Sequence, residues 1–307
     1  MFLSEIHMKK ILLDNALESW SVAVKYCKYI KNGMVTLHYQ KTFVSSLHNA
    51  IELFLKQIMI DNNEHRVANL LKVRNEKDAL LQLAYYKSKD LSHFFKELNL
   101  EERHKFHSIG FSEVIDKSDS LLKDLLASIN INSIKNELKI LQKLRNDETH
   151  FFIPSNYLTE ENFVKLHNLM IVIFAALQNY DLLPYWGIAL GFSEFSHLNF
   201  TEKELVTFSY KNAVINSSIA KSLKEILSGS LLYNFSYNSF NMVIAEQYFL
   251  EIKEKNLQID YDFNDVLAVI QALNKYGLIE CQNEIVQYED NIRNEYTLPY
   301  LKLYFYY

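Results

Sequence analysis

Three residues near the middle of the chain have the types that RNA cleavage without a metal ion requires. The segment LRNDETHF places Arg145 and Asn146 side by side and His150 five residues after the arginine. An imidazole can accept or donate a proton near neutral pH, as the 2′-hydroxyl of RNA requires when it attacks its own phosphate. A guanidinium can stabilise the negative charge that builds on that phosphate. We therefore take Arg145 and His150 as candidate catalytic residues and Asn146 as an orienting group.

The spacing of this pair limits how one copy of the chain could use it. Positions five apart lie about 140° apart around an ideal helix, so Arg145 and His150 do not share a face. Either the helix kinks or frays before Pro154, or each residue works with its copy from a second subunit of a symmetric dimer. A structural interpretation also stays open from the residues alone, in which Arg145 pairs with a surface carboxylate and His150 caps a helix end.

The composition favours a mainly α fold. The chain has 307 residues, a length typical of two domains, but only 6 glycines and 3 prolines. Antiparallel sandwiches and barrels need many turns, and turns use these two residue types. The sequence therefore predicts long helices joined by few breaks.

Apolar residues recur every three or four positions along most of the chain, which predicts amphipathic helices. The expected helices cover residues 8–31, 35–60, 65–71, 77–87, 92–98, 112–130, 133–151, 160–180, 211–227, 240–256 and 262–276. Asn32-Gly33 is a stop signal for the first helix, and Thr159 is the expected N-cap of the helix 160–180.

A cluster of helix breakers marks the expected domain boundary. Pro184, Gly187 and Gly191 stand within eleven residues, so we predict a helical bundle domain over 1–185 and a smaller α or α+β domain over 192–307. Residues 278–281 and 284–288 look like a short strand pair that follows a helix, and 262–288 is a candidate winged-helix-like element. The aromatic tail 298–307 is strand-like and needs a surface to pair with.

Charge and cysteine content restrict the partners and the compartment. The net charge is −5, whereas proteins that coat nucleic acid carry a basic excess, so any RNA contact must be local. The two distant cysteines form neither a disulfide framework nor a metal motif, which favours a reducing cytoplasm. No apolar run is long enough to span a membrane. We expect no metal and no cofactor.

At LRNDETHF the chain resembles the HEPN (higher eukaryotes and prokaryotes nucleotide-binding) domains, helical bundles in which a His follows an Arg after four to six residues. The residue after that Arg is commonly polar and often Asn, as Asn146 is here. The segment HNAIELFLKQIM, from His48 to Met59, is similar to an early helix of the family through Glu52 and Lys56. The resemblance covers roughly residues 8–182.

The resemblance implies a metal-independent endoribonuclease that acts as a homodimer, with Arg145 and His150 of both copies lining one cleft. It also implies a role in microbial defence, as a toxin or abortive-infection effector that cuts RNA, with an antitoxin or another defence-system protein as partner. The chain departs from one subgroup, which carries a Tyr two residues after the His, because Phe152 stands there.

Other polar residues have simpler interpretations. Glu52 and Lys56 are four apart and predict a salt bridge on a partly buried helix face. Arg103, His104 and His107 in EERHKFH predict a solvated face more than a second site. His167 is expected to pack in its helix.

Two alternative functions remain from the sequence. The first is a non-catalytic HEPN scaffold or sensor that binds a nucleotide or a protein partner, which predicts that the Arg/His pair is buried or points away from any cleft. The second is a DNA-binding regulator that uses 262–288 as a winged helix. It is disfavoured because Lys275 is the only positive charge between Asp260 and Asn291.

Overall fold

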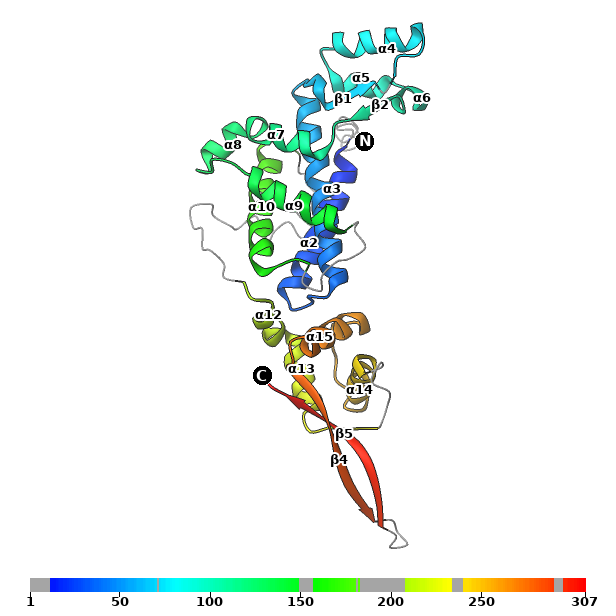
Figure 1. Cartoon of the computed structure of the whole chain (residues 1–307), viewed down its shortest axis with the longest axis vertical. Helices are drawn as coiled ribbons and strands as arrows, with labels where there is room; N and C mark the ends of the chain where they lie inside the picture. Colours follow the sequence, from blue (N-terminus) through cyan, green and yellow to red (C-terminus); the bar gives the residue numbers. More distant parts are fainter. Residues whose placement is uncertain are drawn as a thin grey trace. The chain divides into compact units, whose positions relative to one another are not determined.

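The structure, a computed structural model, describes residues 12–70, 72–148, 157–180, 182, 208–233, 240–289 and 295–307 (Figure 1). The chain divides into two compact units. Unit 1 combines Met1–Cys27 with Lys41–Val206, and unit 2 combines Lys28–Gln40 with Thr207–Tyr307. Helices dominate the described residues, so the predicted mainly α class with a smaller C-terminal part is confirmed.

The core of unit 1 is built on two long helices near the N-terminus. Within this unit, α2 (Leu13–Lys31) packs on α3 (Leu37–Asp61), and the rings of Trp20 and Phe54 meet edge to face with centroids 6.1 Å apart. Phe43 of α3 in turn contacts Phe163 of α10 (Glu160–Asn179) at 5.6 Å. All four of these aromatic side chains are buried, which explains why apolar stripes on both helices were strong enough to predict them.

Helix α10 begins where the sequence predicts. The hydroxyl of Thr159 accepts a hydrogen bond from the backbone N–H of Asn162, which satisfies one of the free donors of the first turn. From Leu169 to Leu177 the helix is buried on most sides. It packs against α9 (Lys135–Glu148) and α8 (Lys123–Ser128).

One predicted helix of unit 1 is broken. The expected helix 112–130 is instead α7 (Phe111–Leu121) followed by α8, because Leu122 between them leaves the helical conformation with φ −106° and ψ 14°. Leu122 is fully buried. The break therefore turns both short apolar faces toward the same core, which one straight helix would not do.

An insert between α3 and α7 has its own small aromatic core. Its elements are the 3₁₀ turn His65–Val67, β1 (Ala68–Leu70), α4 (Glu76–Lys87), α5 (Leu91–Glu97), α6 (Leu100–Arg103) and β2 (Phe106–Ser108). The ring of Tyr85 lies at its centre, in contact with those of Phe94, Phe95 and Phe106. The helix predicted over 65–71 is wrong, because Ala68–Leu70 pairs antiparallel with Phe106–Ser108.

In the described part of unit 2, four helices accompany a three-stranded antiparallel sheet. The helices are α12 (Tyr210–Asn216), α13 (Ser218–Leu227), α14 (Phe240–Glu254) and α15 (Phe263–Lys275), and the strands are β3 (Leu231–Tyr233), β4 (Ile279–Glu289) and β5 (Glu295–Phe305). The sheet order is β3-β5-β4. The expected helix 211–227 is interrupted at Ser217, whose hydroxyl caps α13 by accepting from the N–H of Ala220.

The strand pair predicted for the C-terminal part is also wrong. Residues 278–281 and 284–288 do not pair with each other, because 279–281 and 284–288 belong to the single strand β4. The partner of β4 is the tail strand β5, in a register that runs from Ile279 opposite Phe305 to Glu289 opposite Glu295. In this part a helix and a strand are followed by two helices and a hairpin that ends at Phe305 and not at residue 288, so the winged-helix-like element over 262–288 stays a prediction.

The tip of the α2–α3 hairpin belongs to unit 2. Helix α2 ends in a Schellman motif, in which Gly33 has φ +96° and the N–H of Met34 donates to the carbonyl of Tyr29. The Cα of Val214 lies 2.8 Å from where a Cβ on Gly33 would stand. The predicted boundary at 181–191 falls almost wholly outside the described residues, so the division into 1–185 and 192–307 stays a prediction.

Candidate functional site

The end of α9 carries the arginine and asparagine of the predicted site. The helix forms because Ile134, Leu138, Leu141 and Leu144 recur at four, three and three residues and are all buried. This stripe packs on α7 and α10. Arg145 and Asn146 follow Leu144 in the last turn and are exposed to solvent. His150 lies outside the described residues, as does Pro154, so the relation of His150 to Arg145 stays a prediction.

Arg145 has no polar partner among the residues that the structure describes. Within the described ranges its guanidinium makes no hydrogen bond and no ion pair, although its charge acts on His48 of α3. The simple structural interpretation of Arg145, a pair with a surface carboxylate, therefore finds no support among these residues.

Tyr157, the first described residue after the motif, is bonded to the last turn of α9. The buried hydroxyl of Tyr157 donates a hydrogen bond to the backbone carbonyl of Leu144. Residues 149–156 therefore connect Glu148, the last residue of α9, to Tyr157, which is bonded to the last turn of α9.

A polar face of α3 lies next to this turn. His48, Glu52 and Lys56 stand at intervals of four and so share one side of the helix. Nζ of Lys56 lies 2.6 Å from Oε1 of Glu52, which confirms the predicted salt bridge, and 3.0 Å from the hydroxyl of Ser108. Nδ1 of His48 lies 3.7 Å from Oε2 of Glu52. Only 4% of Lys56 is exposed, so this is a buried ammonium with two oxygen partners.

The sequence analysis missed His48 as a member of this group. Its ring contacts that of Phe111 on α7, with centroids 4.2 Å apart. Burial lowers the pKa of His48 to about 4, against the opposing effect of the Glu52 carboxylate. The positive charges of Arg145 and Lys56 lower this pKa further. His48 is therefore neutral at pH 7, and the spacing of 48, 52 and 56 was the signal that could have identified it.

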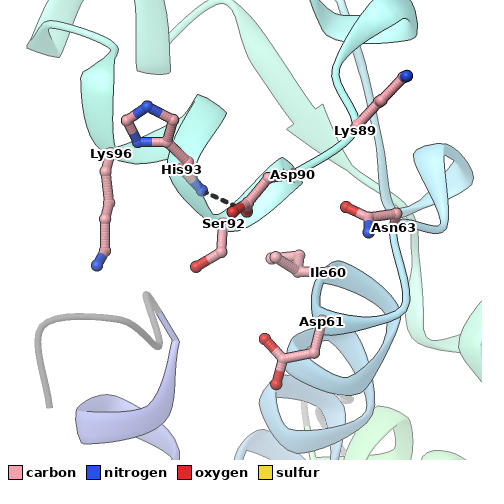
Figure 2. A pocket seen from close by; sticks show the side chains of 8 residues that line it. All are labelled: Ile60, Asp61, Asn63, Lys89, Asp90, Ser92, His93 and Lys96. Carbon is pink, nitrogen blue, oxygen red and sulfur yellow. Dashed lines mark hydrogen bonds between the residues drawn. The ribbon is translucent and has the colours of Figure 1, made fainter. Parts of the chain in front are cut away.

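One described pocket is separate from the end of α9. It has a volume of about 600 Å³ and lies between the last turn of α3 and the start of α5 (Figure 2). Figure 2 shows the carboxylate of Asp61, the hydroxyl of Ser92 and the ammonium of Lys96 around its lower part. Neither Arg145 nor Asn146 lines it. The hydrogen bond drawn there is the N-cap of α5, in which Asp90 accepts from the N–H of His93 at 2.8 Å.

The remaining predicted polar residues are placed as follows. Arg103, His104 and His107 are exposed on the insert, as a solvated face requires. The ring of His167 on α10 contacts that of Phe163 at 6.4 Å. Among the residues that the structure describes, no three His, Cys, Asp or Glu side chains gather in a way that could hold a metal ion. Within the same ranges, no helix is both long and apolar enough to cross a membrane.

Comparison with known proteins found no matching family model, no similar curated protein and no similar solved structure.

Proposed function

We propose that this protein is a metal-independent endoribonuclease of the HEPN type, with Arg145, Asn146 and His150 at its active site. The observation that carries the proposal is the exposure of Arg145 and its lack of a described ion-pair partner. Its side chain is exposed at the end of α9 and has no ion-pair partner among the described residues. An exposed guanidinium on a helix whose opposite face is locked in the core can meet a phosphate without rearrangement of the fold.

The chain itself keeps His150 within reach of this arginine. His150 follows Glu148 by two residues, so their Cα atoms are at most about 7 Å apart. The bond from Tyr157 to the carbonyl of Leu144 returns the chain to the turn that precedes Arg145. A loop closed in this way supports a site in which one histidine and one arginine act on the same phosphate.

The proposed reaction balances without a metal ion or an added reactant. His150 removes the proton of the 2′-hydroxyl, and the 2′-oxygen forms a bond to phosphorus while the bond from phosphorus to the 5′-oxygen breaks. Arg145 stabilises the charge on the phosphorane, and Asn146 orients the phosphate or the imidazole. The departing 5′-oxygen takes a proton from the imidazolium of the same or the second copy. The products are a 2′,3′-cyclic phosphate and a 5′-hydroxyl.

A homodimer is part of the proposal. The net charge of −5 does not attract RNA over the whole surface, so positive charge must be gathered locally. Two copies related by a twofold axis would place two Arg145 and two His150 in one cleft. The proposed substrate is RNA, and the proposed context is microbial defence or toxicity, in the cytoplasm, with an antitoxin or another defence-system protein as partner.

The test is an RNA cleavage assay in EDTA with total RNA and tRNA as substrates. The wild type is compared with His150→Ala and Arg145→Ala at equal folded concentration, and Arg66→Ala is the control because Arg66 is also an exposed arginine. We expect cutting by the wild type and the control, with cyclic phosphate ends, and a loss of at least about 100-fold in the two site variants. Cutting that survives in both site variants would contradict the assignment.

One observation favours the alternative of a non-catalytic HEPN scaffold or sensor. A pocket of about 600 Å³ is lined by residues of α3 and of the segment 89–96, and not by the end of α9. Such a scaffold would bind its ligand in the cleavage assay's conditions without cutting RNA, and Arg145→Ala would leave that binding unchanged.

A further inference from the structure

A second, smaller pocket opens beside the buried ammonium of Lys56. It lies in unit 1, between the C-terminal half of α3 and the β1–β2 pair, and has a volume of about 200 Å³. Its walls are mainly apolar and include Ile60, Val67, Phe95 and Phe106. The two phenylalanine rings meet at 79° with centroids 5.4 Å apart, so one of them can offer its face where the other offers its edge.

Each polar side chain of this pocket keeps at least one hydrogen-bond donor unused. Lys56 has three N–H groups, of which two are bound by Glu52 and Ser108. The hydroxyl of Ser108 accepts from Lys56 and keeps its own hydrogen for another acceptor. Arg103 uses one Nη2–H for the carbonyl of Lys96, at 2.9 Å, and retains the rest of its guanidinium.

This combination restricts the ligand. The volume is below the roughly 300–1,000 Å³ of pockets that enclose a drug-sized molecule, so it suits a single planar ring system. Aromatic and guanidinium faces stack on nucleobases. Lys56 and Arg103 can only donate, and Ser108 keeps its own hydrogen, so the lining favours a ring edge that presents acceptors. Guanine carries two adjacent acceptors, N7 and O6, whereas adenine places an amino group beside its N7.

We propose that the pocket lined by Lys56, Arg103 and Ser108 binds one guanine base through its N7/O6 edge. The phosphate of the same nucleotide lies outside the pocket, toward the larger neighbouring one. The two pockets share Ile60, and Lys96 lines the larger pocket while its carbonyl holds Arg103. The larger pocket offers the ammonium groups of Lys89 and Lys96 to a phosphate, beside the carboxylates of Asp61 and Asp90.

The guanine has two sources. In the first, it belongs to the RNA substrate, and this arm rests on the proposed nuclease function. His48 near the end of α9 and Ile60 at this pocket are twelve residues apart on α3, roughly 18 Å along the helix, a distance that a short single strand can span. In the second, the ligand is a free guanine nucleotide.

The first experiment measures the binding of GMP and of AMP to the full chain by isothermal titration calorimetry. We expect GMP to bind at least about tenfold more tightly than AMP. Arg103→Gln and Ser108→Ala should each weaken GMP binding by about tenfold, since each removes a hydrogen-bond donor. Arg66→Gln is the matched control, with the same loss of charge at an exposed arginine outside the pocket, and should bind as the wild type does.

Arg103 and Ser108 are exposed, so neither substitution should unfold the protein. Circular dichroism checks this, and a loss of GMP binding in a folded variant can then be assigned to the pocket. Equal binding of GMP and AMP, no binding of GMP, or GMP binding that Arg103→Gln leaves unchanged would overturn the proposal.

A second experiment separates the two sources of guanine. Fluorescence anisotropy with the His150→Ala protein in EDTA compares eight-nucleotide single-stranded RNAs that contain or lack one guanine. Tighter binding of the guanine-containing RNA, lost in Arg103→Gln, assigns the pocket to the substrate. Selective GMP binding with no guanine dependence for RNA assigns it to the free nucleotide. Selective GMP binding by a protein that cuts no RNA would refute the proposed nuclease and leave the pocket standing.

Discussion

The hydroxyl of Tyr157 bonds to the backbone carbonyl of Leu144, the residue directly before Arg145. This one contact joins the start of the segment leading to α10 to the last turn of α9. Both Tyr157 and Leu144 are buried, so the contact is also part of the core. The geometry of the candidate site thus depends on a tyrosine that lies outside the Arg/His motif.

We expect Tyr157→Phe to impair the site more than the fold. The variant keeps the buried ring but removes the hydrogen bond, which should lower the free energy of unfolding by about 1–2 kcal/mol in urea. RNA cleavage should fall by about tenfold, because Tyr157, which follows His150 by seven residues, is no longer bonded to the turn that precedes Arg145. Tyr180→Phe is the control, since its hydroxyl also binds a backbone carbonyl, that of Leu121, at 2.6 Å. Equal effects of both variants on cleavage would show that the contact is merely structural.

His48 makes the stability of unit 1 depend on pH. The unfolded chain binds a proton at His48 below about pH 6.5, whereas burial holds the pKa in the folded protein at about 4. Falling pH therefore favours the unfolded state across this window, by up to about 3 kcal/mol. His48→Gln should unfold with less dependence on pH between 6.5 and 4 than the wild type. His104→Gln, at an exposed position, should keep the wild-type dependence, and an unchanged slope in His48→Gln would refute the role of burial.

Substitution of Lys56 measures how much its buried ion pair with Glu52 contributes to the free energy of unfolding. Lys56→Met keeps the apolar stem but leaves Glu52, of which 23% of the side chain is exposed, without its ammonium. We expect a loss of about 2 kcal/mol in the free energy of unfolding, and a smaller loss in Lys56→Met combined with Glu52→Gln. Lys165→Met breaks a pair with Glu161 of the same 2.6 Å length and the same spacing, on an exposed face. That control should cost less than about 1 kcal/mol, and equal losses at both sites would contradict the effect of burial.

Substitution of two glycines with positive φ in unit 2, Gly33 and Gly229, distinguishes the cost of backbone strain from the cost of a steric clash. A Cβ on Gly33 would stand 2.8 Å from the Cα of Val214, whereas a Cβ on Gly229, at φ +78°, meets no atom within 4 Å. Gly229→Ala should lower the free energy of unfolding by about 1–2 kcal/mol, the cost of the left-handed conformation alone. Gly33→Ala should cost at least about 2 kcal/mol more, because backbone atoms must move. Thermal unfolding of both variants decides this, and equal melting temperatures would show that the contact yields easily.

The helices were predictable where burial has a helical period. Helix α9 shows this most plainly, because its four buried residues from Ile134 to Leu144 repeat at three and four. Helix α10 was predicted from its apolar length and from its cap at Thr159. In both cases the pattern that predicts the helix lies within one continuous stretch of sequence, so the segments that pack against it did not have to be known.

The errors concern structure that depends on distant partners. Ala68–Leu70 is a strand only because Phe106–Ser108 pairs with it, and no pattern of three residues reveals that. The strand β4 was divided in two because its true partner, β5, lies beyond residues 290–294 and not at the next turn. Breaks at Leu122 and Ser217 were missed because each is a single residue within an otherwise amphipathic run.

The candidate site was predictable in its residue types but not in its surroundings. The motif identifies Arg145 and Asn146, and both are exposed as a site requires. His48 was hidden because it contributes through burial against Phe111 and through the nearby charge of Arg145, which come from three different helices. The pocket lined by Lys56, Arg103 and Ser108 could not be predicted for the same reason, since α3, α6 and β2 each supply one of these side chains.

Unit 2 is assembled from two stretches of chain that are made at different times. Residues 28–40 leave the ribosome early, yet Ile30 and Val35 are fully buried, and Gly33 fits against Val214. At about 5–20 residues per second, this turn waits on the order of ten seconds for the segment that covers it. During that interval its apolar side chains are open to chaperones and to other nascent chains. A chain cut off after unit 1 would keep them open permanently, so the unit that carries Arg145 would be prone to aggregate when produced alone.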